Sequence, residues 1–237
     1  MLQLKWKAAT VLFLAALAMG WPFLSSARAA GDSAPPDSGV LVILSQGRKV
    51  GTERFKITPS ASGLEATGEL DVEMPGSGKA SETSTLKLDQ KFRPVSYVRQ
   101  QRSPKKGSVN VDFGSPETTL TTSVEGGNDE RIFYLSADHL AVLDTNFFHH
   151  YALLLRQYDS IKNGAQLFNV FVPQEATPAT ISLEFVGVES TTVGKTARKL
   201  NHFAAQTDEL KIDLWAGPDG EIYRMSIPQA NLEILRQ

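Results

Sequence analysis

The sequence predicts a mainly β protein: a large curved antiparallel sheet, built as a half-barrel or sandwich, with one amphipathic helix packed on its concave face. Three observations support this fold class. Apolar and polar residues alternate with a period of two in many short segments. Gly, Pro, Ser and Asp separate these segments at intervals of about 8 to 12 residues. One segment, near residues 145–158, has the periodicity of a helix instead.

The first two expected strands, 40–44 and 50–57, form a hairpin with a turn at Gln46-Gly47. In segment 69–74, apolar residues alternate with Glu69, Asp71 and Glu73, which indicates one buried and one wet face. The same alternation recurs at 86–88, 95–97, 109–113, 181–185, 210–214 and 223–227. Because parallel strands need long crossover connections, this close spacing favours antiparallel pairing.

Segment 145–158 is expected to form the helix. At about 100° per residue its large apolar side chains share one arc: Phe147, Phe148, Tyr151, Leu154, Leu155 and Tyr158. His149 and Arg156 lie opposite, and Asp144 or Asn146 can cap the first turn. Since burying each large side chain contributes about 1.5 to 3 kcal/mol, the helix is expected to be an integral plug or lid.

The first 29 residues are expected to be a cleavable signal peptide. Lys5 and Lys7 precede an apolar run at 8–19, and Ala27-Arg28-Ala29 is a small-x-small cleavage site. Residues 30–39 then form a flexible lead, and 40–237 form a single β-rich domain. The apolar run is short for a membrane span. The mature protein is therefore expected to have no stable membrane span and to be periplasmic or secreted.

Composition excludes several kinds of chemistry. The chain has no Cys, which excludes disulfides, thiolate metal sites, a cysteine nucleophile and a lipid-bearing N-terminal Cys. Removing residues 1–29 leaves 21 Lys and Arg against 26 Asp and Glu, a net charge of −5. Binding nucleic acid or an anionic membrane surface requires bases that neutralise phosphates, so neither is expected as a partner.

The titratable residues form no recognisable catalytic or metal-binding motif. The neighbours of His149 and His150 at helical spacing are not metal ligands, so both are interpreted as solvated or helix-edge histidines. Glu69, Asp71 and Glu73 have a spacing compatible with a glycosidase pair, but a catalytic acid needs burial to raise its pKa. We therefore expect no cofactor, no metal and no enzymatic activity. A hydrolase that uses carboxylates is the least favoured alternative.

Two further features are interpreted as hairpin ends. Gly194-Lys195 resembles part of a phosphate-binding loop, but Glu189 occupies a position where that loop needs glycine, and strand patterns flank it. A basic cluster surrounds Pro104 between two expected strands: Arg99, Arg102, Lys105 and Lys106. An exposed hairpin tip is the favoured interpretation of this cluster. A site for a lipid phosphate or an acidic partner is the alternative.

Short motifs run in order along residues 40–237: 47–53 (GRKVGTE), 143–147 (LDTNF), 171–173 (FVP), 185–189 (FVGVE), 194–200 (GKTARKL) and 214–224, which begins LW. In this order they resemble an exported bacterial family that is catalogued only as a domain of unknown function. The resemblance implies a bent antiparallel sheet wrapped around a helix, similar to the half-barrel of periplasmic lipoprotein carriers. In such carriers the concave apolar face holds acyl chains. The resemblance implies no catalytic residues.

Three classes of function stay open. In the favoured class, Phe147, Phe148, Tyr151 and Trp215 contact a lipid or other hydrophobic ligand in a groove between sheet and helix. The second class is a structural or partner-binding envelope protein, with a filled core and an exposed sheet edge. The third is an enzyme, in which titratable groups with shifted pKa values converge in a cleft.

Overall fold

A computed structural model describes residues 34–74, 78–162 and 164–237 of the chain. The expected signal peptide lies outside the described residues. The expected flexible lead, 30–39, is described only from residue 34. Its last part is not a lead, because the first strand already begins at Asp37. The Asp37 side chain is buried and paired with Arg236 of the last strand, 2.5 Å away, which ties this segment into the sheet.

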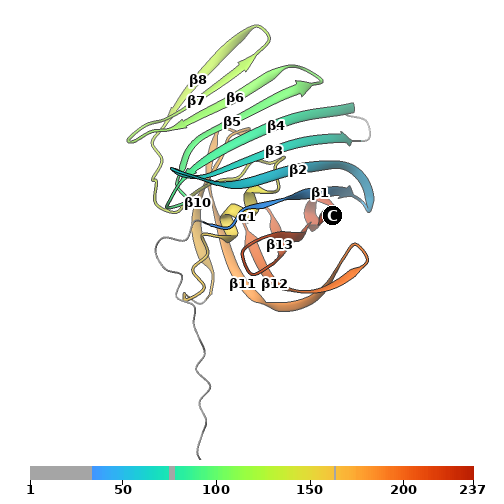
Figure 1. The fold of residues 1–237 in the computed structure, drawn as a ribbon. Coiled ribbons are helices and arrows are strands. Elements are labelled where there is room, and N and C mark those ends of the chain that lie inside the picture. Colours follow the sequence, from blue (N-terminus) through green and yellow to red (C-terminus); the bar gives the residue numbers. More distant parts are fainter. Residues whose placement is uncertain (1–33, 75–77, 163) are drawn as a thin grey trace, which may run out of the picture. The chain divides into compact units, whose positions relative to one another are not determined.

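The described residues form one 15-stranded sheet and one α-helix (Figure 1). In chain order the elements are β1 (Asp37–Ser45), β2 (Arg48–Ser60), β3 (Gly63–Met74), β4 (Gly78–Asp89), β5 (Pro94–Ser103), β6 (Gly107–Phe113), β7 (Thr118–Val124), β8 (Gly127–Phe133), β9 (Leu140–Val142), α1 (His150–Leu155), β10 (Gln166–Val172), β11 (Thr177–Val193), β12 (Thr196–Gln206), β13 (Lys211–Ala216), β14 (Ile222–Ile227) and β15 (Leu232–Arg236). The expected fold class, a large curved sheet with one helix on its concave face, is confirmed.

The sheet consists of two antiparallel meanders that meet at β1 and β15. Strands β1 to β8 follow one another on one side, and β10 to β15 follow one another on the other. Antiparallel pairing of Leu41 with Arg236 and of Ile43 with Ile234 joins the two meanders. The short β9 pairs with β10 in parallel and also lies near β5, so the sheet curls back on its concave side. A parallel pair needs a crossover, and that crossover contains α1.

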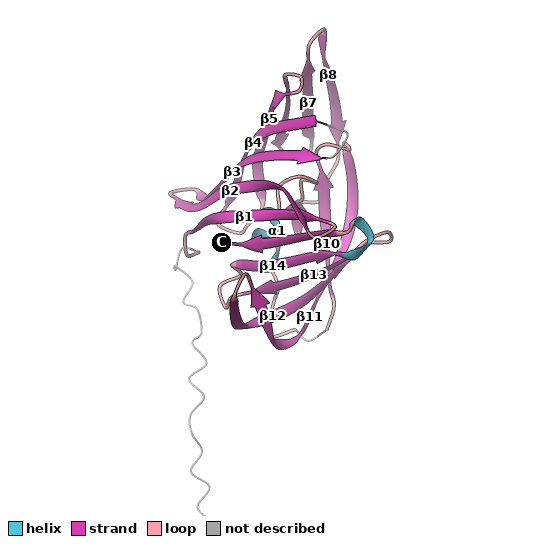
Figure 2. Ribbon diagram, turned by 90° about the vertical axis from the view of Figure 1, so that its right-hand side faces the viewer, coloured by secondary structure: helices cyan, strands magenta, loops and turns pink. Residues whose placement is uncertain are grey.

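Period-two burial fixes which face each strand turns inward. On β2, Phe55 and Ile57 are buried, while Arg54 and Lys56 between them are exposed. On β3, Leu70 is buried and Glu69 and Glu73 are exposed, so the expected wet face of this strand is confirmed. The inward side chains of both meanders join one continuous core with the side chains of α1. Figure 2 shows how the strands curve around this core.

The helix is shorter than the expected segment 145–158: α1 covers only His150–Leu155. The preceding residues form tight turns, in which the amides of His150, Tyr151 and Ala152 bond three residues back along the chain. Helical periodicity extends through this region, but α1 begins only after His149, and the Glu53 carboxylate of β2 accepts the backbone amides of Phe148 and His149. We call residues 143–155, which comprise these turns and α1, the plug.

Several strands were not expected from the alternation pattern. Strand β7 is rich in Thr, β8 is almost entirely polar and exposed, and β9 has three consecutive buried residues. The long hairpin of β11 and β12 was expected, and Val193 and Thr196 pair across its Gly194-Lys195 turn. The interpretation of that dipeptide as a hairpin turn is therefore confirmed. Among the described residues, no helix is long and apolar enough to span a membrane.

The fit between plug and sheet gives a first testable prediction. A Cβ added at Gly68 of β3 would lie 2.7 Å from the Phe147 ring and 2.8 Å from the His149 ring, both fully buried. Neither ring has room to move, so we expect Gly68→Ala to lower the free energy of unfolding by about 1 to 3 kcal/mol. Urea titration followed by circular dichroism measures this change.

The matched control is Gly127→Ala on the edge strand β8, where an added Cβ meets nothing within 4 Å. We expect this control to change the stability by less than about 0.5 kcal/mol. Equal stabilities of the two variants would contradict the close approach of the plug to β3.

Candidate functional site

Buried polar side chains gather where the plug meets the concave face of the sheet. They come from strands β2, β4 and β5 and from the plug itself: Glu53, Glu82, Ser84, Tyr97, Asp144, His149 and His150, each at most 4% exposed. Ionisable side chains are rarely buried unless they are paired. A cluster of buried ionisable residues is therefore a candidate functional site. We call it the buried network.

Glu53 of β2 is the main acceptor for the first turn of the plug. Its carboxylate accepts the backbone N–H of Phe148 at 2.8 Å and that of His149 at 3.4 Å. It also forms a short contact with Nδ1 of His149. The His149 ring stacks on Phe55, two residues further along β2, with ring centroids 5.7 Å apart. One strand therefore supplies both the acceptor and the apolar surface for His149.

Asp144 is the second centre of the network. Its carboxylate accepts the Tyr97 hydroxyl through a short hydrogen bond and the backbone N–H of Asn146 at 2.8 Å. Its own backbone N–H donates to Nδ1 of His150 at 3.3 Å. Asp144 thus closes a local turn and anchors that turn to β5 through Tyr97. The expectation that Asp144 or Asn146 caps the helix is wrong, because α1 begins after His149 and no side-chain hydrogen bond caps it.

Glu82 and Arg99 extend the network toward the open part of the sheet. The Arg99 guanidinium binds both carboxylate oxygens of Glu82, at 2.7 and 2.8 Å. Glu82 also accepts the side-chain amide of Asn146 at 3.1 Å. Bidentate Arg–carboxylate pairs are geometrically specific, so Arg99 orients Glu82 on neighbouring β4, and Glu82 in turn accepts the hydrogen bond from Asn146 of the plug.

Burial controls protonation in the network. It raises the pKa of Asp144 to about 6. Burial, followed by the nearby Asp144, raises the pKa of the Tyr97 hydroxyl well above its usual range. Burial and then His149 lower the pKa of His150 well below its usual range, so His150 is neutral at pH 7. A neutral imidazole can accept the Asp144 amide at Nδ1 only as the tautomer with its proton on Nε2.

The network has acid and base groups but no access for a substrate. Glu53 and His150 are completely buried, and His149 is 1% exposed. The Nε2 atoms of His149 and His150 have no hydrogen-bond partner among the described residues. Within the same part of the chain, no group of three or more His, Asp and Glu residues is arranged to hold a metal ion. The contacts of the network hold the plug in place on the sheet.

The interpretation of His149 and His150 as solvated or helix-edge residues is wrong. In a continuous helix His149 would lie opposite the apolar arc, but the chain turns before α1 and both rings are buried. Their burial is possible because Glu53 pairs with His149 and the Asp144 amide donates to His150.

The four expected ligand-contacting residues do not lie together. Phe147 and Phe148 are core residues of the plug, and Tyr151 packs beside them at half burial. Trp215 lies on the opposite face of the sheet, because its neighbours Leu214 and Ala216 on β13 are the ones that point inward. Its ring stacks on His202 at 4.7 Å.

Trp215 belongs to a row of directly paired residues on the outer face. Trp215 pairs with Arg224, Arg224 with Leu235, and Leu235 with Val42, so these four side chains cross β13, β14, β15 and β1 in order. Residues directly opposite one another in a sheet lie on the same face. We call them the outer row.

The distal part of the β11–β12 hairpin, residues 187–200, folds over the outer row; we call it the arm. Glu189 accepts the Trp215 indole N–H at 3.0 Å, and Thr191 accepts from Arg224 at 3.0 Å. Glu189 also contacts His202 at 2.9 Å, and His202 contacts Asp213 at 3.0 Å. The Trp215 N–H and then His202 lower the pKa of Glu189. Alternate residues of the arm thus attach to successive strands.

Two hollows lie at the periphery of the sheet. One, of about 590 Å³, lies between the arm and strands β1, β14 and β15; we call it the arm hollow. The other, of about 740 Å³, is lined at the β5–β6 turn by Arg102, Lys105 and Lys106. The basic cluster is therefore divided: these three bases form the expected exposed tip, whereas Arg99 pairs with buried Glu82.

No sequence pattern indicated that Glu53, Glu82, Tyr97 and Asp144 belong to one cluster. A signal for Glu53 was present, since it has the same period-two phase as Phe55 and Ile57. A carboxylate in the apolar phase of a strand indicates a buried partner. Nothing in the sequence identified that partner, because His149 is 96 residues away.

No family model matches the chain, and no curated protein matches it. Among solved structures, it is similar to a beta-barrel-like protein of the domain of unknown function DUF1849 from Brucella abortus, with a TM-score of 0.58 and 9% identity over 86% of this chain and 96% of that one. The likeness shows the fold alone. A DUF1089 family protein from Pseudomonas aeruginosa has a TM-score of 0.48 and 9% identity, over 75% of this chain and 90% of that one.

Glu53 gives the second prediction. Glu53→Ala leaves two amides and the His149 ring without their buried acceptor, so we expect the free energy of unfolding to fall by about 3 to 5 kcal/mol. Chemical denaturation measures the loss. Glu69→Ala is the matched control, since this glutamate is exposed on the outer face of neighbouring β3; we expect a change of less than about 0.5 kcal/mol. Similar losses for the two variants would rule out an anchoring role for Glu53.

The third prediction concerns pH. Between pH 4 and 6 the folded chain keeps a proton on Asp144, whose pKa is about 6, while the unfolded chain releases it. Asp144 therefore favours folding as the pH falls through this range, by up to about 3 kcal/mol. His150 lowers the stability as the pH falls. Below about pH 6.5 its ring is protonated in the unfolded chain, whereas the buried ring of the folded chain stays neutral.

Single variants separate these two opposing effects. Compared with the native chain, Asp144→Asn should lose more stability on acidification from pH 6 to 4, and His150→Asn should lose less. Unfolding free energies measured in urea at several pH values test both slopes. If the unfolding free energies of the native chain and of both variants changed equally with pH, neither Asp144 nor His150 would titrate as its burial requires.

Proposed function

We propose that the chain is an exported, non-catalytic binding protein of the bacterial envelope that takes up a hydrophobic or amphipathic molecule. The observation that carries this proposal is the arm hollow, an accessible space with a largely apolar floor formed by Val42, Leu44 and Leu235. The pattern of a signal peptide at residues 1–29 supports export. The resemblance to lipoprotein-carrier half-barrels is consistent with a binding role.

The arrangement of titratable groups favours binding over catalysis. A general acid or base must come within hydrogen-bond reach of the reacting atoms. Glu53, Asp144, His149 and His150 are buried where the plug packs on the sheet. The plug also occupies the concave face, where a groove for a ligand was expected. Phe147 and Phe148 could meet a ligand there only after the plug had moved away from the sheet.

A partner-binding envelope protein without a small-molecule ligand is the alternative. The edge strand β8 favours it, because among the described strands its only partner is β7. Near this edge Val124, Ile132 and Tyr134 are 60, 52 and 74% exposed. An exposed edge can accept a strand from another protein, although charged residues such as Asp129 and Glu130 oppose such pairing.

Native mass spectrometry tests the proposed function. The full chain is purified without detergent from the exported fraction, and any molecule released by solvent is identified. We expect the mass of a chain that begins at Ala30, together with a stoichiometric apolar or amphipathic molecule. In the variant Leu44→Asp this molecule should be lost, because the charge would be placed in the apolar floor of the hollow.

Tyr151→Asp is the companion variant, since Tyr151 is the half-buried aromatic residue of the plug. Loss of the ligand from this variant alone would move the site to the sheet–helix groove. A ligand-free mass, with no uptake of added lipids, would overturn the proposed function and favour the partner-binding alternative.

A further inference from the structure

We propose that the arm hollow is a site for a single-chain amphipathic carboxylate, with Arg198 pairing with its head group and the outer face of β1 and β15 contacting its chain. This inference rests on the proposed binding function and gives the ligand a site and a chemical class. It uses residues on the outer face of the sheet, separate from the buried network and from the plug.

The floor of the arm hollow is apolar and accessible. Val42 and Leu44 come from alternate positions of β1, and Leu235 pairs directly with Val42 on β15. All three side chains are half-buried. They form an apolar patch, because most other side chains on the outer face of the neighbouring strands are charged or polar. Leaving such side chains in contact with water is unfavourable, and an alkyl chain lying on them would remove apolar area from water.

The arm covers the hollow, and two hydrogen bonds attach it to the outer face of the sheet. Glu189 attaches it to Trp215 of β13, and Thr191 attaches it to Arg224 of β14. The next residue in this alternation, Val193, is buried and lines the hollow beside Val42. A site that is already formed before binding avoids the entropic cost of ordering the arm.

The charged side chains that line the arm hollow are both basic. They are the guanidinium groups of Arg198 and Arg236, and no acidic side chain of the described residues lines the hollow. In a chain with more acids than bases, such a lining selects an anion.

The two arginines are in different situations. The Arg236 guanidinium is engaged by Asp37 at 2.5 Å and by the Ser38 carbonyl at 2.7 Å. Arg198 lies over the Tyr223 ring, 4.8 Å from its centroid, and no carboxylate of the described residues is within ion-pair distance of it. Arg198 is exposed and keeps its donors available. A planar guanidinium binds a carboxylate through two parallel hydrogen bonds, which gives Arg198 the role of head-group anchor.

The size of the hollow is appropriate for one small amphiphile. Its volume of about 590 Å³ falls within the range of small-molecule sites, about 300 to 1,000 Å³. Arg198 of the arm provides a charged end and the β1 side chains provide an apolar end. A molecule with one anionic group and one alkyl chain satisfies both.

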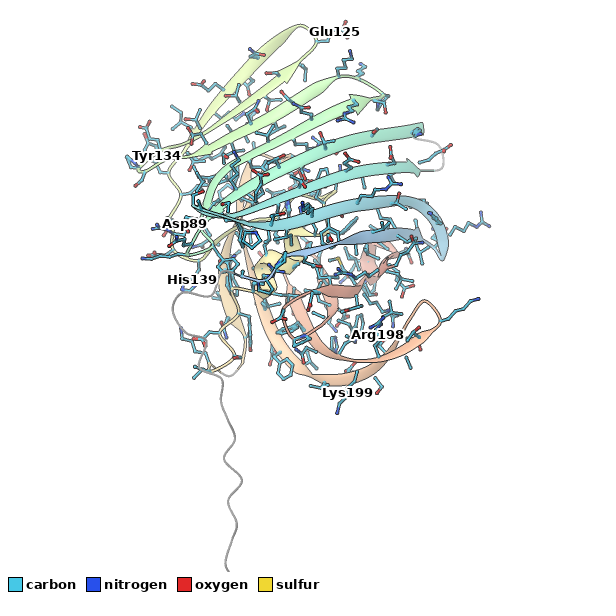
Figure 3. All side chains as sticks on the ribbon, viewed as in Figure 1. Asp89, Glu125, Tyr134, His139, Arg198 and Lys199 are labelled. Carbon is cyan, nitrogen blue, oxygen red and sulfur yellow. The ribbon has the colours of Figure 1, made fainter. Side chains whose placement is uncertain are left out.

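Arg198 and Lys199 offer a matched pair for the test. They are neighbours on β12, so their side chains point to opposite sides of the hairpin (Figure 3). Both are exposed bases, but only Arg198 lines the hollow. Arg198→Ala and Lys199→Ala therefore change the net charge equally and differ in the group that faces the ligand.

The probes are dodecanoate and dodecanol, titrated calorimetrically into the delipidated full-length mature protein below the concentration at which dodecanoate forms micelles. For the native chain and for Lys199→Ala we expect dodecanoate to bind at least tenfold more tightly than dodecanol. In Arg198→Ala this preference should disappear, while dodecanol binding is unchanged. Shortening the chain of the carboxylate should weaken binding by about fourfold for each buried methylene removed.

A floor variant checks the position of the alkyl chain. Leu44→Ser should weaken both probes and leave the preference for the carboxylate intact, because the head-group contact remains. Circular dichroism and thermal unfolding of each variant establish that the sheet is retained.

The outcomes separate this inference from the proposed function. Binding of both probes with no effect of Arg198→Ala would overturn the head-group assignment and leave a hydrophobic-ligand protein. Equal losses from Arg198→Ala and Lys199→Ala would indicate a general effect of charge and would also overturn it. Failure of the native chain to bind either probe, together with a ligand-free native mass, would overturn both the site and the proposed function.

Discussion

The hydrogen bonds from the first turn of the plug to the Glu53 carboxylate are the contacts on which the interior of the protein depends. A concave sheet of this size has more apolar surface than its own strands can cover, and the plug covers it. The plug, however, brings backbone amides and two histidines into the core, where each unpaired polar group is costly. Glu53, Asp144 and Glu82 supply the missing acceptors. The apolar packing of Phe147 and Phe148 is possible only because these carboxylates satisfy the polar groups beside them.

The same arrangement determines where a ligand can bind. The plug fills the concave face where a half-barrel otherwise offers a groove, and the titratable groups of the network are buried beneath it. The outer face is different, because the long β11–β12 hairpin extends beyond β13 and its distal part lies across four strands. This arm encloses a space with an apolar floor and a positively charged lining. The inner face therefore stabilises the fold, and the outer face carries the proposed binding function.

Much of the architecture follows from the sequence, and the reasons are local. Strands such as β2 and β3 have strict alternation, which determines both their conformation and the face they bury. The pattern was less informative for β7 and β8, which are polar on both faces, and for β9, which is buried on both. It also overestimated the helix, since a helical period over 145–158 does not reveal that Glu53, far away in the chain, accepts the backbone amides of Phe148 and His149.

Local patterns and composition were enough to predict the class of fold, the solvent-exposed face of β3, the tight turn at Gly194-Lys195 and the absence of cysteine chemistry. Each of these depends on neighbouring residues or on composition alone. The tertiary structure decided that His149 and His150 are buried, that Trp215 lies apart from Phe147 and Phe148, and that Arg198 faces an apolar floor. These facts depend on pairings between residues far apart in the chain, such as Glu53 with His149 and Leu41 with Arg236. The curvature of the sheet sets such pairings, and period-two alternation specifies a face of a strand without specifying its partner.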